Sequence, residues 1–272
     1  MNKRLKTKIT YTQPEHPLWA WFIMQVIEYA CGRRQLERKI NTVLDTDPTP
    51  LALWGCMLDS LNIKLNFDGE KLDKVGDGPL VFIANHPYGV VDGLALGYLA
   101  SLVRSEFKFL VNAVLCKEEK LNQFFLPVDF EESKEALQTN IETRKRAIQH
   151  LMAGEAILLF PSGGVATAPQ FWMKAEDLEW KKFVLKLIKR SGATVVPIHF
   201  PGQNSRLFHF ASQINLHLRL SLLLREVKNK QNMELNIAVG DPIPEGEWNK
   251  IPKKELLSYF KKKVDQLAVT VT

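Results

Sequence analysis

Short apolar segments alternate with longer stretches of helical periodicity from residue 61 to about residue 244, and this alternation leaves few possible folds. The apolar segments have the length and composition of buried strands, and the stretches between them repeat apolar residues every three or four positions. Strands separated by such helices predict an α/β protein, with a mixed sheet flanked by helices on both faces. The expected strands are 63–67, 80–84, 108–111, 156–160, 194–200 and 235–239, and the expected helices are 93–105, 117–124, 133–153, 179–191 and 214–226.

Two further regions flank this α/β domain, which is expected to span residues 61–245. Residues 1–60 predict an N-terminal helical segment, broken near Pro48 and Pro50, and residues 246–272 predict a basic C-terminal helix. Inside the domain, Ser133 is a typical N-cap for the helix that follows it, and Gly154 is placed to end the same helix.

The balance of charges indicates an anionic partner. The net charge is +6 and the sequence pI is about 9.1. No zinc-finger, RNA-recognition or helix-turn-helix pattern accompanies the basic residues, which argues against nucleic acid. The basic residues gather near the two ends of the chain, so an anionic membrane surface is the predicted partner, with two solvated ends as the alternative. Cys31, Cys56 and Cys116 form no CxxC pair, which favours a reducing compartment over a disulfide framework or a structural zinc site.

The segment 18–31 bears on the relation to a membrane. It is shorter than the roughly 20 apolar residues of a membrane span, and it contains Gln25 and Glu28. Its Trp19, Trp21 and Tyr29 suit the lipid headgroup boundary, and the same helix can equally pack on the domain core. The first twelve residues have no signal-peptide pattern. These features predict a peripheral protein on the cytoplasmic face of the membrane, without a transmembrane span.

The most informative segment is VFIANHPYGVVDG, residues 81–93. An apolar strand runs into Asn85 and His86, followed by a Gly-containing turn and then Asp92. Such a turn can place Asp92 where it accepts a hydrogen bond from one ring nitrogen of His86. The other ring nitrogen is then left to act as a general base. The spacing equally allows a structural arrangement, in which His86 caps the turn and Asp92 caps the next helix. A metal site is disfavoured, because no third ligand or HExxH pair accompanies them.

Two other strand ends carry candidate binding residues. AILLFPSGGVAT, residues 156–167, ends a buried strand in a flexible turn whose backbone N–H groups can approach an anion. VVPIHFPGQNSRLFHF, residues 195–210, leads into a loop with Arg206, which either holds an anionic headgroup or is simply solvated. The candidates in the first turn are Phe160, Pro161, Ser162, Gly163 and Gly164.

In content and order these segments resemble the motif blocks of the glycerolipid acyltransferase superfamily, of the lysophospholipid acyltransferase type. The first block is resembled by NHPYGVVDG, and the second by residues 108–130, which end in FFLPVDF. The third block is resembled by FPSGG, and the fourth by VVPIHF. The resemblance extends from residue 61 to residue 244. It implies that His86 is the catalytic base and that Asp92 orients it. The candidate substrate-binding residues are Asn85, Lys117, Arg206 and the FPSGG turn, and Asn85 has either a structural or a polarising part.

Two departures from the family pattern point to a branch and an acceptor. Five residues separate His86 from Asp92, where four are usual, and the wider spacing looks like the bacterial ornithine-lipid and hemolysin-like acyltransferases. Ser162 stands where the third block usually has Glu, and Gly164-Val165 stands where a Thr-Arg pair helps to bind phosphate acceptors. A lyso-aminolipid, a lysophospholipid or another single-chain lipid with a free hydroxyl is therefore the expected acceptor.

The predicted reaction is direct transfer of a fatty acyl group from acyl-CoA or acyl-carrier protein to that hydroxyl, at a membrane surface and without a bound cofactor or metal. No GxSxG elbow is present, so no serine nucleophile is expected. One alternative is a 1-acyl-glycerol-3-phosphate acyltransferase of phospholipid synthesis, in which Arg206 or Lys117 holds the phosphate. Alternatives of other classes are a lipid or thioester hydrolase and a non-catalytic membrane-binding module.

Overall fold

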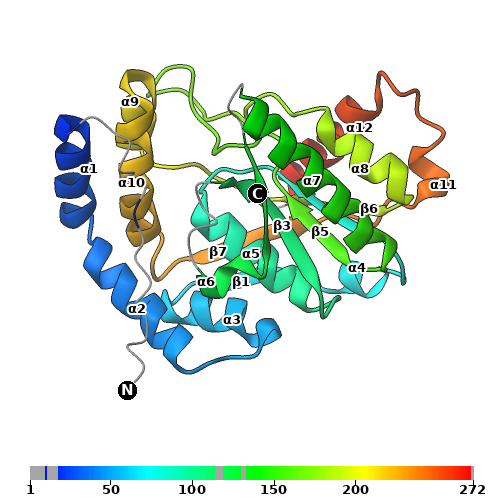
Figure 1. Cartoon of the computed structure of the whole chain (residues 1–272), viewed down its shortest axis with the longest axis horizontal. Helices are drawn as coiled ribbons and strands as arrows, with labels where there is room; N and C mark the ends of the chain where they lie inside the picture. The colour runs from blue at the N-terminus through cyan, green and yellow to red at the C-terminus, as the bar shows by residue number, and fades with distance from the viewer. Residues whose placement is uncertain (1–9, 11–17, 114–118, 130–132, 271–272) are drawn as a thin grey trace.

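The computed structural model of the chain describes residues 10, 18–113, 119–129 and 133–270 (Figure 1). The described residues form a seven-stranded sheet in the order β1-β7-β6-β2-β5-β3-β4. Neighbouring strands pair in parallel except β6 and β7, which are antiparallel, so the predicted mixed sheet is confirmed. The strands are β1 Lys64–Phe67, β2 Leu80–Ala84, β3 Phe107–Asn112, β4 Phe125–Val128, β5 Ala156–Leu159, β6 Thr194–His199 and β7 Glu234–Val239.

Helices cover both faces of this sheet, as the sequence predicts. The side chains of β2 alternate between two apolar clusters: Phe82 packs with α3, α5 and α10 on one face, and Ile83 packs with α7, α8 and α12 on the other. The helices are α1 Leu18–Ala30, α2 Arg33–Asp45, α3 Pro50–Ser60, α4 Glu70–Asp73, α5 Val90–Ser101, α6 Glu119–Asn122, α7 Lys134–Met152, α8 Phe183–Ser191, α9 Arg206–Ile214, α10 Leu216–Asn229, α11 Glu245–Trp248 and α12 Leu256–Gln266.

The register of the three central strands decides where their ends lie. Ile83 of β2 pairs with Leu159 of β5 on one side and with Pro197 of β6 on the other. All five residues of β2 are buried, as expected for a parallel strand covered on both faces. Because these three strands run parallel, the residues that follow them emerge together at the carboxyl edge of the sheet.

The N-terminal helices pack against the same core. Met24 of α1 and Leu36 of α2 are almost fully buried, and α1 lies against α10. α1 also leaves several large apolar side chains exposed, so it has both the core contact and the exposed apolar surface that its sequence allows. None of the described helices has the length and apolar character needed to cross a bilayer. The domain boundaries near residues 60 and 245 stay predictions, and all seven strands of the sheet lie between them.

Several element boundaries differ from the sequence expectations. β4 was not expected; it is an edge strand containing Pro127, and an edge position tolerates a residue that has no backbone N–H. The helix expected at 214–226 corresponds to α10, and α9 before it is an additional helix. α9 begins at Arg206, because the Ser205 hydroxyl accepts a hydrogen bond from the Phe208 N–H at 3.3 Å. The predicted N-cap at Ser133 is present, with the Ala136 N–H donating to its hydroxyl at 3.0 Å.

Candidate active site

His86 and Asp92 meet at the carboxyl end of β2. Nδ1 of His86 lies 3.1 Å from Oδ2 of Asp92, and the same oxygen accepts hydrogen bonds from the N–H groups of Tyr88 at 2.7 Å and Gly89 at 3.0 Å. Asp92 is the third residue of α5. Its carboxylate therefore both caps the N-terminus of this helix and contacts the His86 ring. The functional and structural interpretations of this segment are therefore compatible.

A glycine makes this turn possible. Gly89 has φ +87°, which lies in the region that favours glycine, and a Cβ there would lie 3.2 Å from both Leu223 and Val165. The chain consequently reverses within residues 85–89, between β2 and α5, and this reversal brings the first turn of α5 back to His86.

The surroundings of the pair are mostly buried. The Asp92 side chain is fully buried, whereas the His86 side chain keeps about 15% of its surface exposed. Burial raises the pKa of Asp92, and the hydrogen bonds from the His86 ring, Tyr88 and Gly89 oppose this increase. Because Nδ1 faces a carboxylate, it carries the ring proton of neutral His86, which leaves Nε2 as the basic nitrogen.

The FPSGG turn after β5 lies directly beside this histidine. The Phe160 ring stacks on the His86 ring, with the centroids 3.7 Å apart and 17° between the planes. The turn is held by two internal hydrogen bonds, from Gly163 N–H to Phe160 O at 2.9 Å and from the Ser162 hydroxyl to Gly164 O at 3.0 Å. The Gly163 N–H is therefore already bonded, whereas the Gly164 N–H makes no hydrogen bond within the described part of the chain. Pro161 accepts a hydrogen bond from the Lys181 N–H at 2.8 Å, which ties the turn to the start of α8.

Asn85 connects β2 to β6. Its amide donates to the Phe200 carbonyl at 2.8 Å and accepts from the Phe200 N–H at 2.8 Å. The Asn85 side-chain amide thus both donates to and accepts from the backbone just after β6. The structure shows a bracing role for Asn85, and the substrate contact predicted for it stays a prediction.

The fourth motif also packs against the first. Gly202 has φ +95°, and a Cβ there would lie only 1.9 Å from the Tyr88 hydroxyl oxygen. Burial and the nearby Asp92 raise the pKa of Tyr88 to about 12. The loop that contains Gly202 is anchored by the buried Glu226, which accepts hydrogen bonds from the Ser205 N–H at 3.0 Å and from its hydroxyl at 2.6 Å.

Two cations that the sequence did not single out lie next to the site. Arg206 is exposed on the first turn of α9 and forms no hydrogen bond or ion pair within the described chain, and Lys117 lies outside the described residues. Instead, Arg219 of α10 donates to the Val165 carbonyl beside the FPSGG turn. Nζ of Lys230, just after α10, lies 4.8 Å from the centroid of the Tyr88 ring.

Sequence reasoning missed both of these cations. Burial lowers the pKa of Arg219 and of Lys230, and in the case of Lys230 the nearby Glu226 and Asp92 oppose this decrease. The one available signal was a lone arginine within the apolar run LHLRLSLLL, which is unusual for a helix that packs on a core.

Asp177 is a third residue that the motifs did not reveal. Its Oδ1 accepts a hydrogen bond from the His86 N–H at 3.1 Å, and its Oδ2 accepts one from Trp180 Nε1 at 2.8 Å. Burial raises the pKa of Asp177, with these hydrogen bonds opposing the increase. Asp177 therefore holds the backbone of His86 while Asp92 holds its ring. Within the described ranges, no three His, Cys, Asp or Glu side chains converge as a set of metal ligands.

This mixed sheet, with a His-Asp pair at the end of its central strand and a glycine turn beside it, defines an α/β enzyme of the glycerolipid acyltransferase class. The chain belongs to the acyltransferase family, whose sequence model, described as Acyltransferase, matches residues 33–266. The predicted superfamily and the predicted O-acyltransferase activity are thereby confirmed, which sets aside the non-catalytic module.

Three known proteins illustrate the relationship. The chain is 29% identical over 229 residues to a lyso-glycine lipid O-acyltransferase of Bacteroides thetaiotaomicron, covering 80% of this chain and 79% of that protein. It is also 29% identical over 224 residues to a lyso-glycine lipid O-acyltransferase of Phocaeicola vulgatus, covering 78% of this chain and 75% of that protein. The crystal structure of the 1-acyl-sn-glycerophosphate acyltransferase of Thermotoga maritima has the same fold, with a TM-score of 0.53 at 14% identity, covering 93% of this chain and 90% of that one.

Proposed function

We propose that this protein transfers a fatty acyl group from a thioester, acyl-CoA or acyl-carrier protein, to the hydroxyl of a lyso-aminolipid of the lyso-glycine lipid type. Two relatives carry the name lyso-glycine lipid O-acyltransferase. The departure of the third motif from the phosphate-binding pattern, at Ser162, supports the same acceptor. The observation that carries the proposal is the 3.1 Å contact of His86 Nδ1 with Asp92 Oδ2.

The geometry supports a single-displacement reaction. Nε2 of His86 removes the proton from the acceptor hydroxyl, and the oxygen attacks the thioester carbonyl while Asp92 stabilises the imidazolium. The tetrahedral intermediate then collapses to the ester, and the departing thiolate takes the proton back from His86. The Gly164 N–H is available as a donor to the oxyanion, because it makes no other hydrogen bond in the described chain.

Two half-buried cations suit recognition of an anionic headgroup. A glycine joined to a fatty acid through its nitrogen retains a carboxylate. Arg219 donates to the Val165 carbonyl just after the FPSGG turn, and Lys230 lies over the Tyr88 ring, two residues after His86. The same two cations would also suit a phosphate. For that reason 1-acyl-glycerol-3-phosphate acyltransferase activity is the second candidate.

An exposed apolar surface supports action on a bilayer. α1 and α9 both pack against α10 (Figure 1). Trp21 and Phe22 of α1 and Phe210 of α9 are exposed, and Phe210 lies 5.7 Å from Phe171 of a neighbouring loop. Exposed aromatic side chains of this kind suit the headgroup region of a membrane. We infer peripheral attachment through this surface, at the cytoplasmic face where acyl thioesters are made.

The test is donor turnover with purified protein. Long-chain acyl-CoA or acyl-carrier protein is mixed with a panel of lyso-lipids in micelles, including a lyso-glycine lipid and lysophosphatidate, and free thiol and esterified product are measured. We expect thiol release only with the lyso-glycine lipid, reduced about 10²- to 10⁴-fold in His86→Ala. Thiol release without any acceptor would indicate a hydrolase, and selective use of lysophosphatidate would establish the second candidate. Full activity in His86→Ala would overturn the mechanism.

A further inference from the structure

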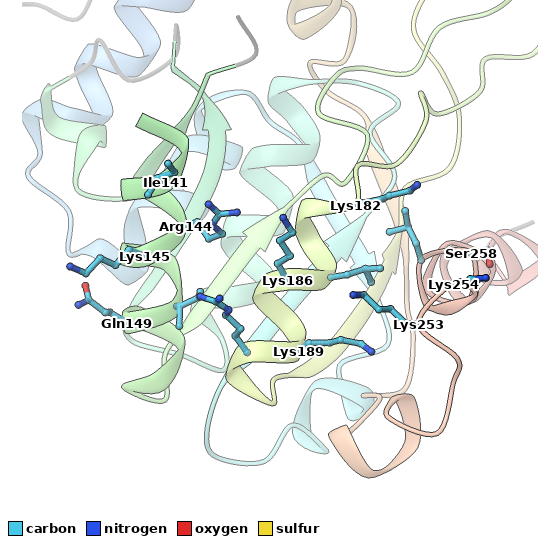
Figure 2. Close-up of a pocket in the computed structure, with 14 residues that line it drawn as sticks. Ile141, Arg144, Lys145, Gln149, Lys182, Lys186, Lys189, Lys253, Lys254 and Ser258 are labelled. Atoms are coloured by element: carbon cyan, nitrogen blue, oxygen red, sulfur yellow. The ribbon is translucent and has the colours of Figure 1, made fainter. Parts of the chain in front are cut away.

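A large basic groove lies on the sheet face opposite α5. It has a volume of about 1310 Å³ and runs between α7, α8 and the segment 253–258 that leads into α12 (Figure 2). α8 forms its middle, and the cations of α8 recur at four- and three-residue intervals, so that they share one face of the helix. These cations are Lys186, Lys189 and Arg190, together with Lys182 immediately before the helix.

The two flanking elements add four more cations. α7 contributes Arg144 and Lys145, and the segment before α12 contributes Lys253 and Lys254 (Figure 2). These eight positive charges exceed the net charge of +6 of the whole chain. The rest of the chain is therefore slightly acidic in formal net charge, and the groove is a local concentration of positive charge.

The groove cations lack acidic partners. None of the described residues that line the groove is Asp or Glu, and none of the groove cations forms an ion pair within the described chain. Some surface cations elsewhere are paired: Lys74 lies 3.1 Å from Asp241, and Lys263 lies 3.6 Å from Glu247. Eight clustered and unpaired cations repel one another, which an acidic ligand would relieve.

One end of the groove adjoins the catalytic edge of the sheet. Lys182 follows Lys181, whose N–H donates to Pro161 in the turn beside His86. From Lys182 to Arg190 the groove extends along α8 for about 12 Å at 1.5 Å per residue. Its lining is not only charged, because Leu185 of α8 and the apolar residues Ile148 and Leu257 also contribute to it.

We propose that this groove docks the acidic acyl-carrier protein and positions its thioester arm toward His86. The inference rests on the proposed function and selects one of its two donors. The groove is lined by both cations and apolar residues, which suits an amphipathic helix with acidic side chains. Coenzyme A is a weaker match, because its few phosphates are too compact for cations spread over three elements. A bilayer is also a weaker match, since the exposed aromatics of α1 and α9 lie on another side of the molecule (Figure 1).

Charge reversal tests this docking. The first variant is Lys186→Glu with Lys189→Glu, the second is Arg144→Glu with Lys254→Glu, and the control is Lys250→Glu with Lys262→Glu, two exposed lysines outside the groove. All three variants change the net charge equally. Thermal unfolding of each confirms the fold.

Both kinetics and direct binding are measured. We expect each groove variant to lower kcat/KM for palmitoyl-acyl-carrier protein by at least about tenfold. The kcat/KM for palmitoyl-CoA should stay within about twofold of the wild-type value. We expect the control variant to match the wild type with both donors. Binding of fluorescently labelled acyl-carrier protein is expected to weaken with added salt and in the groove variants alone.

Binding of each variant to phosphatidylglycerol vesicles is measured alongside. Three outcomes would overturn the proposal: unchanged binding and kinetics with the carrier protein, equal losses with both donors, or a loss confined to vesicle binding. Failure of the proposed function is distinguishable, because then no donor is used with any lyso-lipid. The binding measurement still decides for or against the groove in that case.

Discussion

The ring of His86 lies almost parallel to the ring of Phe160, with the two centroids 3.7 Å apart. The two residues come from the ends of the adjacent strands β2 and β5, so the sheet itself sets their distance. Asp92 contacts Nδ1 of the histidine, and Phe160 covers one face of its ring. Together they leave the His86 ring little freedom to rotate.

Replacing Phe160 by alanine removes the support on one ring face and leaves the His86-Asp92 contact possible. We expect kcat to fall about 10- to 100-fold with a smaller change in acceptor KM, because a misplaced base lowers the rate of proton transfer more than it lowers binding. Phe160→Leu keeps much of the volume and should lose less. Steady-state kinetics with a saturating thioester measures this, and equal losses in both variants would contradict a stacking role.

Asn85→Ala removes both hydrogen bonds to Phe200, whose backbone is buried. Leaving a buried backbone group unpaired costs about 1–3 kcal/mol, so we expect a clear loss of unfolding free energy in urea. Asn66→Ala is the matched control, since Asn66 bonds to Asn236 between strands on the exposed surface. That change should cost less than about 0.5 kcal/mol. A stable Asn85→Ala protein with poor acceptor binding would instead support the predicted substrate contact.

Gly97→Ala should destabilise the contact between α3 and α5. A Cβ on Gly97 would lie 2.5 Å from the Trp54 ring, and overpacking of this kind costs about 1–3 kcal/mol. Gly93, one turn earlier in the same helix, has no atom within 4 Å of a Cβ, so Gly93→Ala should stabilise the protein by about 0.5–1 kcal/mol. Thermal or urea unfolding compares the two variants, and effects of the same sign would be inconsistent with this packing.

Asp177→Asn should change how stability depends on pH. Burial raises the pKa of Asp177, so the folded protein binds this proton more tightly than the unfolded chain does. The resulting stabilisation is present at low pH and is lost as the pH rises through the folded pKa. Asn cannot titrate, so the unfolding free energy of the variant relative to wild type should improve as the pH rises. Denaturation at about pH 4 and about pH 7 tests this, and a constant or opposite difference would refute it.

Arg219→Ala and Arg206→Ala compare the contributions of the half-buried Arg219 and the exposed Arg206 to acceptor binding. Arg219 lies beside the FPSGG turn, whereas Arg206 forms no hydrogen bond or ion pair within the described residues. If Arg219 binds the headgroup, its loss should raise acceptor KM about 10- to 100-fold, in line with the worth of a hydrogen bond to a charged group. Arg206→Ala should stay within about twofold. The reverse order of effects would restore the role that the sequence predicts for Arg206.

The sequence alone determined the features that depend on neighbouring residues. The run 80–84 predicts β2 with the bounds that the structure shows, because a strand buried on both faces must be continuously apolar. The turn after it contains His86, Gly89 and Asp92 within seven residues, so their meeting requires only local backbone geometry. The N-cap at Ser133 could be predicted for the same reason, because it depends only on residues close together in the sequence.

Only the tertiary structure decided what lies around that pair. Asp177 is 91 positions from His86, and Phe160 and Arg219 are also remote in sequence, so strand register and helix packing place them beside the site. The basic groove likewise forms where α7, α8 and the start of α12 converge on one face of the sheet. In the sequence these cations resemble ordinary solvated residues, because nothing local distinguishes a helix face that borders a groove from one that faces open solvent.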